Sequence, residues 1–532
     1  MAITRRQFIT RIAQAGGYGA AFTAMHSLGL FGMVATGRQK DFPLPPSTGR
    51  GTKVIILGAG IAGLVSAYEM RRAGFDCTVL EARERPGGRN WTLRKGSKLA
   101  FTDGTSQDCT FDEGNYFNAG PARLPSIHKN MLGYCNELGV ALEVEVNTSR
   151  RTLLQNDDVF GGKPVRLGQA INDARGHIAE LFAKCVQQGA LDQVFSKDDH
   201  EAVLEFLKSY GDLHSGYKYE GSPRSGDRQL PGAADQVEIP LAPLSFPELA
   251  KSGFCQPMLF EEVLEWQATM FQPIGGMDRI PYAFAKSLGE IIRYNCPITE
   301  IRKTSDGVRV SYRRGESGAV ESIEAPYCIC ALPLTILRKI PSDLSSRVKS
   351  AIETVKYDSA YKVAWESRRF WERDGDEIYG GISFLTSGPI PLVWYPSAGL
   401  MSERGVVISG YAMEDFGEFG KLPSTEAKLA ASKAAIDKLH PGKSRELEKP
   451  MYMCWGRVPY NLGSWVSQGA DFSQGGAYFN GPYRELIVPD DRIYFAGDHC
   501  SHVIGWQEGA ALAAQRAVMM IADRIKGSVN QS

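Results

Sequence analysis

The sequence has no excess of charge of either sign. Its 532 residues contain 60 lysines and arginines and 60 aspartates and glutamates, so the formal net charge is zero at neutral pH. A neutral chain creates no long-range field that attracts nucleic acid or anionic lipid. There is also no basic tract interleaved with aromatic residues. The sequence therefore predicts no nucleic-acid partner.

Patterns that bind metals are also missing. None of the ten cysteines stands at C-x-x-C spacing from another, and there are only eight histidines. No zinc pattern can be drawn through these residues, so we predict no metal site. We expect reduced, mostly buried thiols that pack as small apolar side chains, although the sequence alone leaves a disulfide open. Cys328 and Cys330 alternate in a β-type run and should share one face of a strand.

No strongly apolar run of the kind that forms a stable membrane helix is present near the N-terminus. The stretch 12–37 is free of charged residues, but it is rich in glycine and alanine and only weakly hydrophobic. It follows Arg5 and Arg6 in TRRQFI, which resembles a twin-arginine export signal. We predict a leader over 1–37, a linker over 38–50, and a periplasmic or secreted protein. The alternative is an ordinary amphipathic N-terminal helix on a cytoplasmic protein.

The most informative pattern is a glycine-rich turn between a strand and a helix. Residues 54–57 form an apolar run typical of a buried parallel strand, and 61–73 have helical periodicity. Between and within them, Gly58, Gly60 and Gly63 follow the spacing G-x-G-x-x-G. The first glycine permits the tight turn, the second lets the backbone approach a pyrophosphate, and the third lets helix and strand pack closely. The helix N-terminus favours an anion there.

A second strand is predicted over 77–80, and it ends at Glu81. A carboxylate at this place can accept hydrogen bonds from the ribose of an adenosine. The sequence continues with a second glycine pair and two arginines that can wrap the far side of the same pyrophosphate: Arg83, Gly87, Gly88 and Arg89. This extension resembles the FAD signature of the flavin amine oxidase family and not the pattern of an NAD dehydrogenase.

The C-terminal segment resembles the second FAD signature of that family. A predicted strand over 492–496 delivers Gly497 and Asp498, and the resemblance implies that Asp498 bonds a ribityl hydroxyl. Residues 505–508 lead into a helix predicted over 509–525, whose N-terminus can face the anionic edge of the flavin. The two signatures lie some 400 residues apart, so the flavin domain is expected to be assembled from distant segments.

Within the family, the sequence is most similar to the L-amino acid oxidases. The loop NAGPARLP resembles their loop with a carboxylate-binding arginine, which is Arg123 here. The resemblance implies that Lys362 is bridged by water to flavin N5 and that Tyr411 assists the arginine. It places Gly505 and Trp506 beside the substrate amine, with Trp465 completing an aromatic cage. Other residues that it places at the cofactor are Gly120, Pro121, Ala122, Arg123, Ile298, Gly505 and Trp506. No match is found for the active-site histidine of some family members.

We expect an α/β fold with a discontinuous Rossmann-like FAD-binding domain, a mixed-sheet substrate domain and a helical insertion. The FAD-binding domain should comprise 51–105, 275–355 and 485–527. The substrate-binding domain should comprise 106–162 and 356–484, with a mainly helical insertion over 163–274. Within the insertion, the sequence predicts helix over 170–210 and again over 261–271.

The resemblance implies oxidative deamination of L-amino acids by FAD, with dioxygen as the second substrate and 2-keto acid, ammonia and hydrogen peroxide as products. No cysteine stands where monoamine oxidases carry their covalent flavin, so we expect noncovalent FAD. The family also implies a homodimer, and the weak hydrophobicity of 12–37 predicts no stable membrane insertion. Three alternatives remain: a tryptophan 2-monooxygenase type of enzyme that forms an amide, an amine or polyamine oxidase, and a flavin-binding module that serves protein partners.

Overall fold

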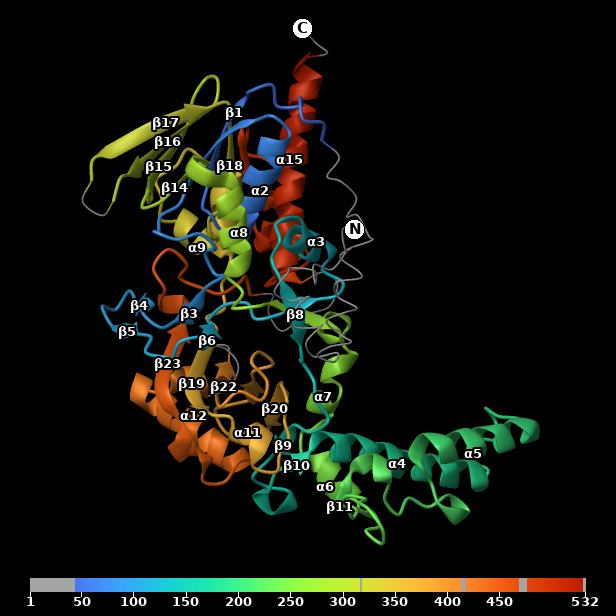
Figure 1. The fold of residues 1–532 in the computed structure, drawn as a ribbon. Coiled ribbons are helices and arrows are strands. Elements are labelled where there is room, and N and C mark those ends of the chain that lie inside the picture. Colours follow the sequence, from blue (N-terminus) through green and yellow to red (C-terminus); the bar gives the residue numbers. More distant parts are fainter. Residues whose placement is uncertain (1–43, 316–317, 413–417, 468–475, 530–532) are drawn as a thin grey trace, which may run out of the picture.

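Five short parallel strands from distant parts of the chain form the sheet at one end of the molecule (Figure 1). The computed structural model describes residues 44–315, 318–412, 418–467 and 476–529. The sheet is buried on both faces, since Val54 and Ile56 point into one core and Ile55 and Leu57 into another. In order across the sheet, its strands are β14 (Ile292–Arg293), β2 (Asp76–Leu80), β1 (Lys53–Leu57), β18 (Tyr327–Cys330) and β24 (Ile493–Phe495).

Helices cover one face of this parallel sheet, and a small antiparallel sheet with short helices covers the other. Helices α2 and α15 lie side by side, and both contribute small buried side chains: Ala67, Ala511 and Ala514. Small side chains let two helices approach closely. The helices of the first face are α2 (Ile61–Arg72), α3 (Lys129–Glu137), α8 (Arg279–Leu288) and α15 (Gln507–Val529). The second face is covered by β15 (Ile298–Lys303), β16 (Val308–Arg313), β17 (Val320–Ala325), α9 (Leu334–Leu337), α10 (Ser346–Thr354), α13 (Ala477–Asn480) and α14 (Pro482–Leu486).

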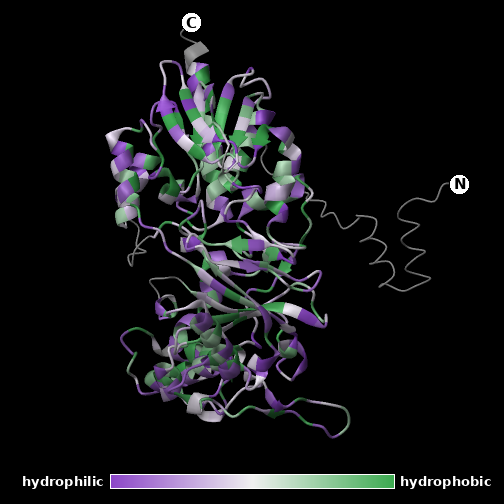
Figure 2. Cartoon of the chain, turned by 90° about the vertical axis from the view of Figure 1, so that its left-hand side faces the viewer, coloured by the Kyte–Doolittle hydropathy of each residue, from purple (hydrophilic) through white to green (hydrophobic). Residues whose placement is uncertain are grey.

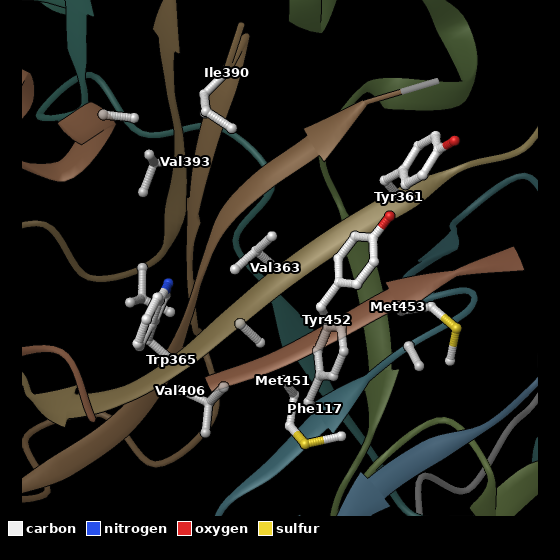
Figure 3. Close-up of a cluster of buried hydrophobic side chains, with 14 of the residues drawn as sticks. Phe117, Tyr361, Val363, Trp365, Ile390, Val393, Val406, Met451, Tyr452 and Met453 are labelled. Carbon is white, nitrogen blue, oxygen red and sulfur yellow. The ribbon is translucent and has the colours of Figure 1, made fainter. Parts of the chain in front are cut away.

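A seven-stranded mixed sheet lies at the other end of the molecule. All its neighbouring strands pair antiparallel except β9 and β20, which are parallel. The order is β10 (Val165–Arg166), β9 (Leu153–Gln155), β20 (Gly381–Leu385), β21 (Leu392–Tyr395), β22 (Arg404–Ala412), β19 (Tyr361–Arg368) and β23 (Glu448–Cys454). Figure 3 shows its apolar core, in which Val363 and Trp365 of β19 lie close to Val406 of β22 and Met451 of β23. The helices α11 (Phe370–Arg373) and α12 (Thr425–Leu439) pack against this sheet.

Short strands occupy the region between the two large sheets (Figure 1). A three-stranded sheet combines β7 (Leu124–Pro125), β13 (Met270–Pro273) and β8 (Leu142–Glu145). There are also two antiparallel strand pairs: β3 (Thr92–Arg94) with β6 (Tyr116–Asn118), and β4 (Lys98–Ala100) with β5 (Ser106–Asp108). This layer brings the loop after β6 to the boundary between the two halves of the molecule. Most of the candidate substrate-binding residues lie at that boundary.

The insertion projects beside the seven-stranded sheet as a helical arm (Figure 1). Its elements are α4 (Leu167–Gln187), α5 (Lys197–Gly211), β11 (Asp227–Gln229), β12 (Ile239–Pro240), α6 (Phe246–Lys251) and α7 (Cys255–Met258). The helix predicted over 170–210 is thus two helices. The second begins at a capping box in which the Ser196 side chain accepts from the Asp199 N–H and Asp199 accepts from the Ser196 N–H.

The helix predicted over 261–271 is wrong. The structure has two single 3-10 turns there, η4 (Phe260–Glu262) and η5 (Leu264–Trp266), followed by strand β13. Strand β13 pairs with β7 on one side and with β8 on the other. Hydrogen bonds to two neighbouring strands decide its conformation, and they override the local periodicity. The expected fold class is confirmed, with a discontinuous parallel sheet, a mixed sheet and a mainly helical insertion.

The distribution of hydropathy follows this layering. In Figure 2, hydrophobic residues concentrate along the inner strands, and hydrophilic residues alternate with them on the outer helices. No helix within the described ranges is both long enough and apolar enough to cross a membrane. All ten cysteines are free thiols, and eight of them are buried, as the sequence predicts. Residues 1–43, which include the predicted leader and the first part of the linker, lie outside the described part of the chain.

We predict that Gly63→Ala lowers the free energy of unfolding by about 1–3 kcal/mol, the usual cost of overpacking. A Cβ atom at Gly63 would lie 1.9 Å from the carbonyl oxygen of Gly58, so strand and helix would have to separate. Gly60→Ala is the matched control, because a Cβ there meets nothing within 4 Å. Chemical denaturation of the two variants, each freed of any bound cofactor, measures the effect. Equal stability of the two would contradict this account of Gly63.

Candidate active site

A cavity of about 1030 Å³ runs from the glycine-rich turn after β1 to the mixed sheet. Every residue predicted at the cofactor or the substrate lines this cavity except Gly63, which packs helix against strand. The cavity wall includes Gly58, Gly60, Glu81, Arg83, Gly87, Gly88, Arg89, Gly120, Pro121, Ala122, Arg123, Ile298, Lys362, Tyr411, Trp465, Gly497, Asp498, Gly505 and Trp506. The structure therefore brings together residues that are up to 448 positions apart (Gly58 to Trp506).

The end of the cavity at β1 has the features of a phosphate cradle. Helix α2 starts after Gly60 with no side-chain cap and no acidic residue in its first turn. Its first N–H groups are therefore not occupied by a side chain, and Ile61 and Ala62 line the cavity. A Cβ on Gly60 would extend into open space, so the glycine leaves room for a ligand close to the backbone. An anion such as a pyrophosphate fits this helix end.

Glu81 is buried at the end of β2 and holds two loops by backbone hydrogen bonds. Its Oε2 accepts from the Ala59 N–H at 2.7 Å, and its Oε1 accepts from the Arg83 N–H at 2.9 Å. A carboxylate has about four acceptor sites, so two remain for hydroxyl groups. The position fits a ribose, but the side chain also orders the glycine-rich turn.

The predicted phosphate-side arginines interact with the protein itself. Arg89 forms a two-pronged pair with Asp498, with Nη1 at 3.1 Å from Oδ2, and Asp498 Oδ2 also accepts from the Gly505 N–H at 3.0 Å. Burial raises the pKa of Asp498, but the charge and hydrogen bonds of Arg89, together with His499 and the Gly505 N–H group, hold this pKa below its ordinary value. Arg83 donates to Asn461 Oδ1 and to the Pro459 carbonyl. The pairing of Arg89 with Asp498 joins the two segments that resemble FAD signatures along one cavity wall.

Lys362 lies on β19 directly opposite Tyr411 of β22. Its Nζ donates to the carbonyl oxygens of Asn118, at 3.0 Å, and Gly120, at 2.5 Å, and lies 5.3 Å from the centre of the Tyr411 ring. Desolvation by burial, followed by the charge of Arg123, lowers the pKa of Lys362 to about 7. This amine can therefore exchange a proton near neutral pH, which an ordinary lysine cannot.

Arg123 is buried against two indole rings. Its guanidinium carbon lies 4.6 Å from the centre of the Trp266 ring and 4.5 Å from that of Trp394, and Nη1 donates to Asn147 Oδ1. Burial lowers the pKa of this guanidinium, an effect partly offset by the charge of Glu145. No ion pair joins Arg123 to a carboxylate of the described residues. A buried cation with free donors in a cavity is suited to a carboxylate ligand, which its planar fork can bind bidentately.

Several residues of this wall escape sequence reasoning. They come from the insertion, where no motif could be matched, and from β21: Phe260, Glu265, Trp266 and Trp394. Trp506 donates from Nε1 to Glu265 Oε2 at 3.2 Å, so the insertion is attached to the predicted cage. Trp465 lies against Gly505. The clustering of tryptophans arises only when the two halves of the chain meet, so no local signal could have revealed it.

No match is found in the sequence for the active-site histidine of some family members, but two buried histidines lie near this cavity. His499 lines the cavity, and His128 makes an edge-on contact with the Trp506 ring at 4.9 Å between ring centres. Burial lowers the pKa of each to about 4. Both rings are therefore neutral at physiological pH.

Comparison with known proteins gives a consistent result. The sequence pattern of the family described as flavin containing amine oxidoreductase matches residues 61–522. The flavin-dependent L-tryptophan oxidase of Lentzea aerocolonigenes is 28% identical over 88% of this chain and 98% of its own, and the L-amino-acid oxidase of Naja atra is 26% identical over 87% and 86%. Putrescine oxidase bound to putrescine has a TM-score of 0.58 at 19% identity, covering 88% of this chain and 98% of its own. Cyclohexylamine oxidase from Brevibacterium oxydans has a TM-score of 0.57 at 15% identity, covering 90% and 100%, and these two structures support the fold alone.

The family implies a flavin, FAD, as the cofactor, and the cavity fits it. The uncapped helix N-terminus at Gly60 suits the phosphates, and Glu81 suits the ribose. The cavity continues past Ile298 to Trp506, so it has space for the rest of the FAD molecule.

We predict that Gly60→Ala weakens FAD retention by at least tenfold, because the added methyl group occupies the space where the backbone would approach the phosphates. The cofactor-free protein should unfold as the wild type does, since the Cβ meets no protein atom within 4 Å. Flavin absorbance after gel filtration, and after titration with FAD, measures the effect. Full flavin occupancy in this variant would place the pyrophosphate elsewhere.

Proposed function

We propose that this chain, which belongs to the family of flavin containing amine oxidoreductases, catalyses the oxidative deamination of L-amino acids. The products would be a 2-keto acid, ammonia and hydrogen peroxide, with dioxygen as the oxidant. The observation that supports this proposal best is the environment of Arg123. It is a buried, cavity-facing guanidinium with no carboxylate of the described residues in ion-pair contact.

The substrate carboxylate would bind to the fork of Arg123, assisted by the hydroxyl of Tyr411. The rings of Trp266 and Trp394 both contact the guanidinium, so they would restrict its position before the substrate arrives. Trp465, Gly505 and Trp506 would surround the amine. When bound, FAD supplies the acceptor for the hydride from the substrate Cα and passes the electrons to dioxygen. The protein contributes orientation, exclusion of water and control of protons.

Lys362 is our candidate for proton control. A hydride can leave the Cα only when the adjacent amine is neutral, whereas a free amino acid carries an ammonium group. Because burial lowers the pKa of Lys362 to about 7, its Nζ can take up a proton near neutral pH. In this proposal the proton passes from the substrate ammonium to Nζ through a water molecule. The neutral histidines His128 and His499 are poorer acceptors, because burial lowers their pKa to about 4.

The side-chain end of the cavity favours large apolar or aromatic substrates. Its walls are formed by Phe260, Trp266, Ile382, Pro389, Pro391 and Leu392. Such a surface gains hydrophobic free energy from an aromatic or branched side chain and offers few partners to a small polar one. A peroxide assay over the twenty amino acids, in both enantiomers, tests the preference. Amide and carbon dioxide in place of keto acid and ammonia would support the monooxygenase alternative.

Three further features belong to the same proposal. FAD would be bound noncovalently, since none of the described residues that line the cavity is a cysteine. The enzyme would act as a homodimer. It would be exported through the twin-arginine leader predicted over 1–37, or remain cytoplasmic if that segment is not a signal.

We predict that Arg123→Lys lowers kcat/KM for an amino acid roughly 10–150-fold, the equivalent of losing one charged hydrogen bond of about 1.5–3 kcal/mol. L-phenylalanine and its decarboxylated counterpart, 2-phenylethylamine, form the matched pair of substrates. The amine should be a poor substrate for the wild type and should be little affected by the substitution. Equal losses on both substrates would make Arg123 a structural residue, and better turnover of the amine by the wild type would favour an amine oxidase.

We also predict that kcat rises with pH through about 7 as Lys362 loses its proton, and that Lys362→Met removes this rise. The depressed pKa means that the neutral form of Lys362 prevails above this pH, so activity increases in the alkaline direction. Lys428→Met is the control, because Lys428 is a buried lysine that donates to the Leu422 carbonyl away from the cavity. A Lys362→Met profile with the same rise would assign the titration to another group.

A further inference from the structure

Glu145 lies buried behind Arg123 at the end of β8, with 3% of its surface exposed. Its Oε1 accepts a hydrogen bond from Trp394 Nε1 at 3.1 Å. Its Oε2 is buried and has no hydrogen-bond partner among the described residues. Half of this carboxyl group is thus fixed, and the other half is left unsatisfied, which is costly for a buried anion.

Trp394 connects this carboxyl group to Arg123. One face of the indole ring carries the guanidinium, while its N–H group holds Glu145. Asn147, two residues beyond Glu145, accepts from Arg123 Nη1. Glu145 therefore acts on Arg123 by its charge but does not occupy the guanidinium fork by ion-pair contact. The fork remains open towards the cavity.

Glu145 also lines a second cavity of about 310 Å³, through which its carboxyl group can exchange a proton with solvent. Glu145 and Trp394 line it together with Glu143, which lies on the same strand and is half-buried. Two other charged groups face this neighbourhood. Arg369, across the second cavity, is paired with Glu372 at 2.7 Å, and Lys362 Nζ lies 5.9 Å from the Trp394 ring centre. Arg123 is the charged group that acts most directly on Glu145.

We propose that Glu145 is a positioning residue that exchanges charge with the substrate: it is ionised in the empty site and takes up one proton when a carboxylate binds Arg123. The inference rests on the proposed function, in which Arg123 receives the substrate carboxylate. The proton comes from solvent through the second cavity and adds to Glu145 Oε2. No bond other than this O–H bond forms. Arg123 is thereby balanced by one carboxylate at a time.

The physical basis is competition between two anions for one cation. Burial raises the pKa of Glu145 to about 7, although Arg123 lowers it. A ligand carboxylate on Arg123 adds a second negative charge and draws on the same cation, so it raises this pKa further. A ligand that raises the pKa of a group binds the protonated form of that group more tightly than the ionised form. Its affinity therefore falls when the pH rises above the pKa of the ligand-free protein. Carboxylate affinity should therefore fall as pH rises above about 7.

The test uses benzoate, which cannot be oxidised, with the FAD-loaded enzyme. Calorimetry in two buffers of different ionisation enthalpy counts the protons taken up between pH 6 and 9. We would use the Lys362→Met background, because a bound anion would raise the pKa of Lys362 in the same direction. In this background the dissociation constant should rise roughly tenfold per pH unit above about 7, with close to one proton taken up.

Glu145→Gln in that background keeps the acceptor for Trp394 Nε1 but removes the titration. We expect a flat affinity profile and no proton uptake when benzoate binds. Glu143→Gln is the matched control on the same strand and should keep both effects. An unchanged pH dependence in Glu145→Gln, or weakening by the same factor at every pH, would overturn the inference and make Glu145 a structural residue.

Two outcomes separate this inference from the proposed function. Benzoate that binds Arg123→Lys as tightly as the wild type would refute carboxylate binding by Arg123 itself, and with it both proposals. If Glu145→Gln does not fold, infrared difference spectra of the otherwise unaltered enzyme decide the matter. Benzoate binding at pH 8 should create a protonated carboxyl band, and the absence of that band would overturn the role of Glu145 alone.

Discussion

The burial of Arg123 without an ion-pair partner is the constraint around which the site is built. Removing a guanidinium from water is expensive, and the protein offsets this cost with two indole faces, one amide oxygen and a carboxylate held at a distance. A desolvated cation–π contact contributes about 2 kcal/mol, so two of them offset part of the cost. The two indoles belong to β21 and to the insertion. The cation is therefore stabilised only when the mixed sheet and the insertion close around the loop that carries it.

The same charge determines the state of Lys362. The charge of Arg123 acts on Lys362, and the guanidinium keeps its proton because its intrinsic pKa is far above that of an amine. Burial and the neighbouring Arg123 leave the lysine with a pKa of about 7. Its two hydrogen bonds to the carbonyls of Asn118 and Gly120 also hold the loop that precedes Arg123. One side chain thus holds the loop that leads to Arg123 and provides a group that can exchange a proton.

The sequence predicts those parts of the site that are encoded by neighbours along the chain. The turn through Gly58, Gly60 and Gly63 and the strand that ends at Glu81 are local patterns, and the structure has them where they were expected. The tertiary partners were beyond prediction: Trp266, Trp394 and Glu145 meet Arg123 only because β8, β13 and β21 come together. The pairing of Arg89 with Asp498, 409 residues apart, belongs to the same class. The error over 261–271 has this origin as well, because β13 is a strand through its pairing with two neighbours.

The fold itself does not distinguish oxidation of amino acids from oxidation of simple amines, since it resembles structures of amine oxidases across 88–90% of this chain. Electrostatics provides the distinction. A cationic amine that enters the cavity meets the like charge of Arg123. Two like unit charges 4 Å apart repel each other by about 4 kcal/mol at an effective dielectric constant of about 20. A zwitterionic amino acid brings the compensating carboxylate with it, so attraction to Arg123 offsets the repulsion of its ammonium group. Under the proposed function, selectivity for the carboxylate would follow from the buried charge, without any further contact to the rest of the substrate.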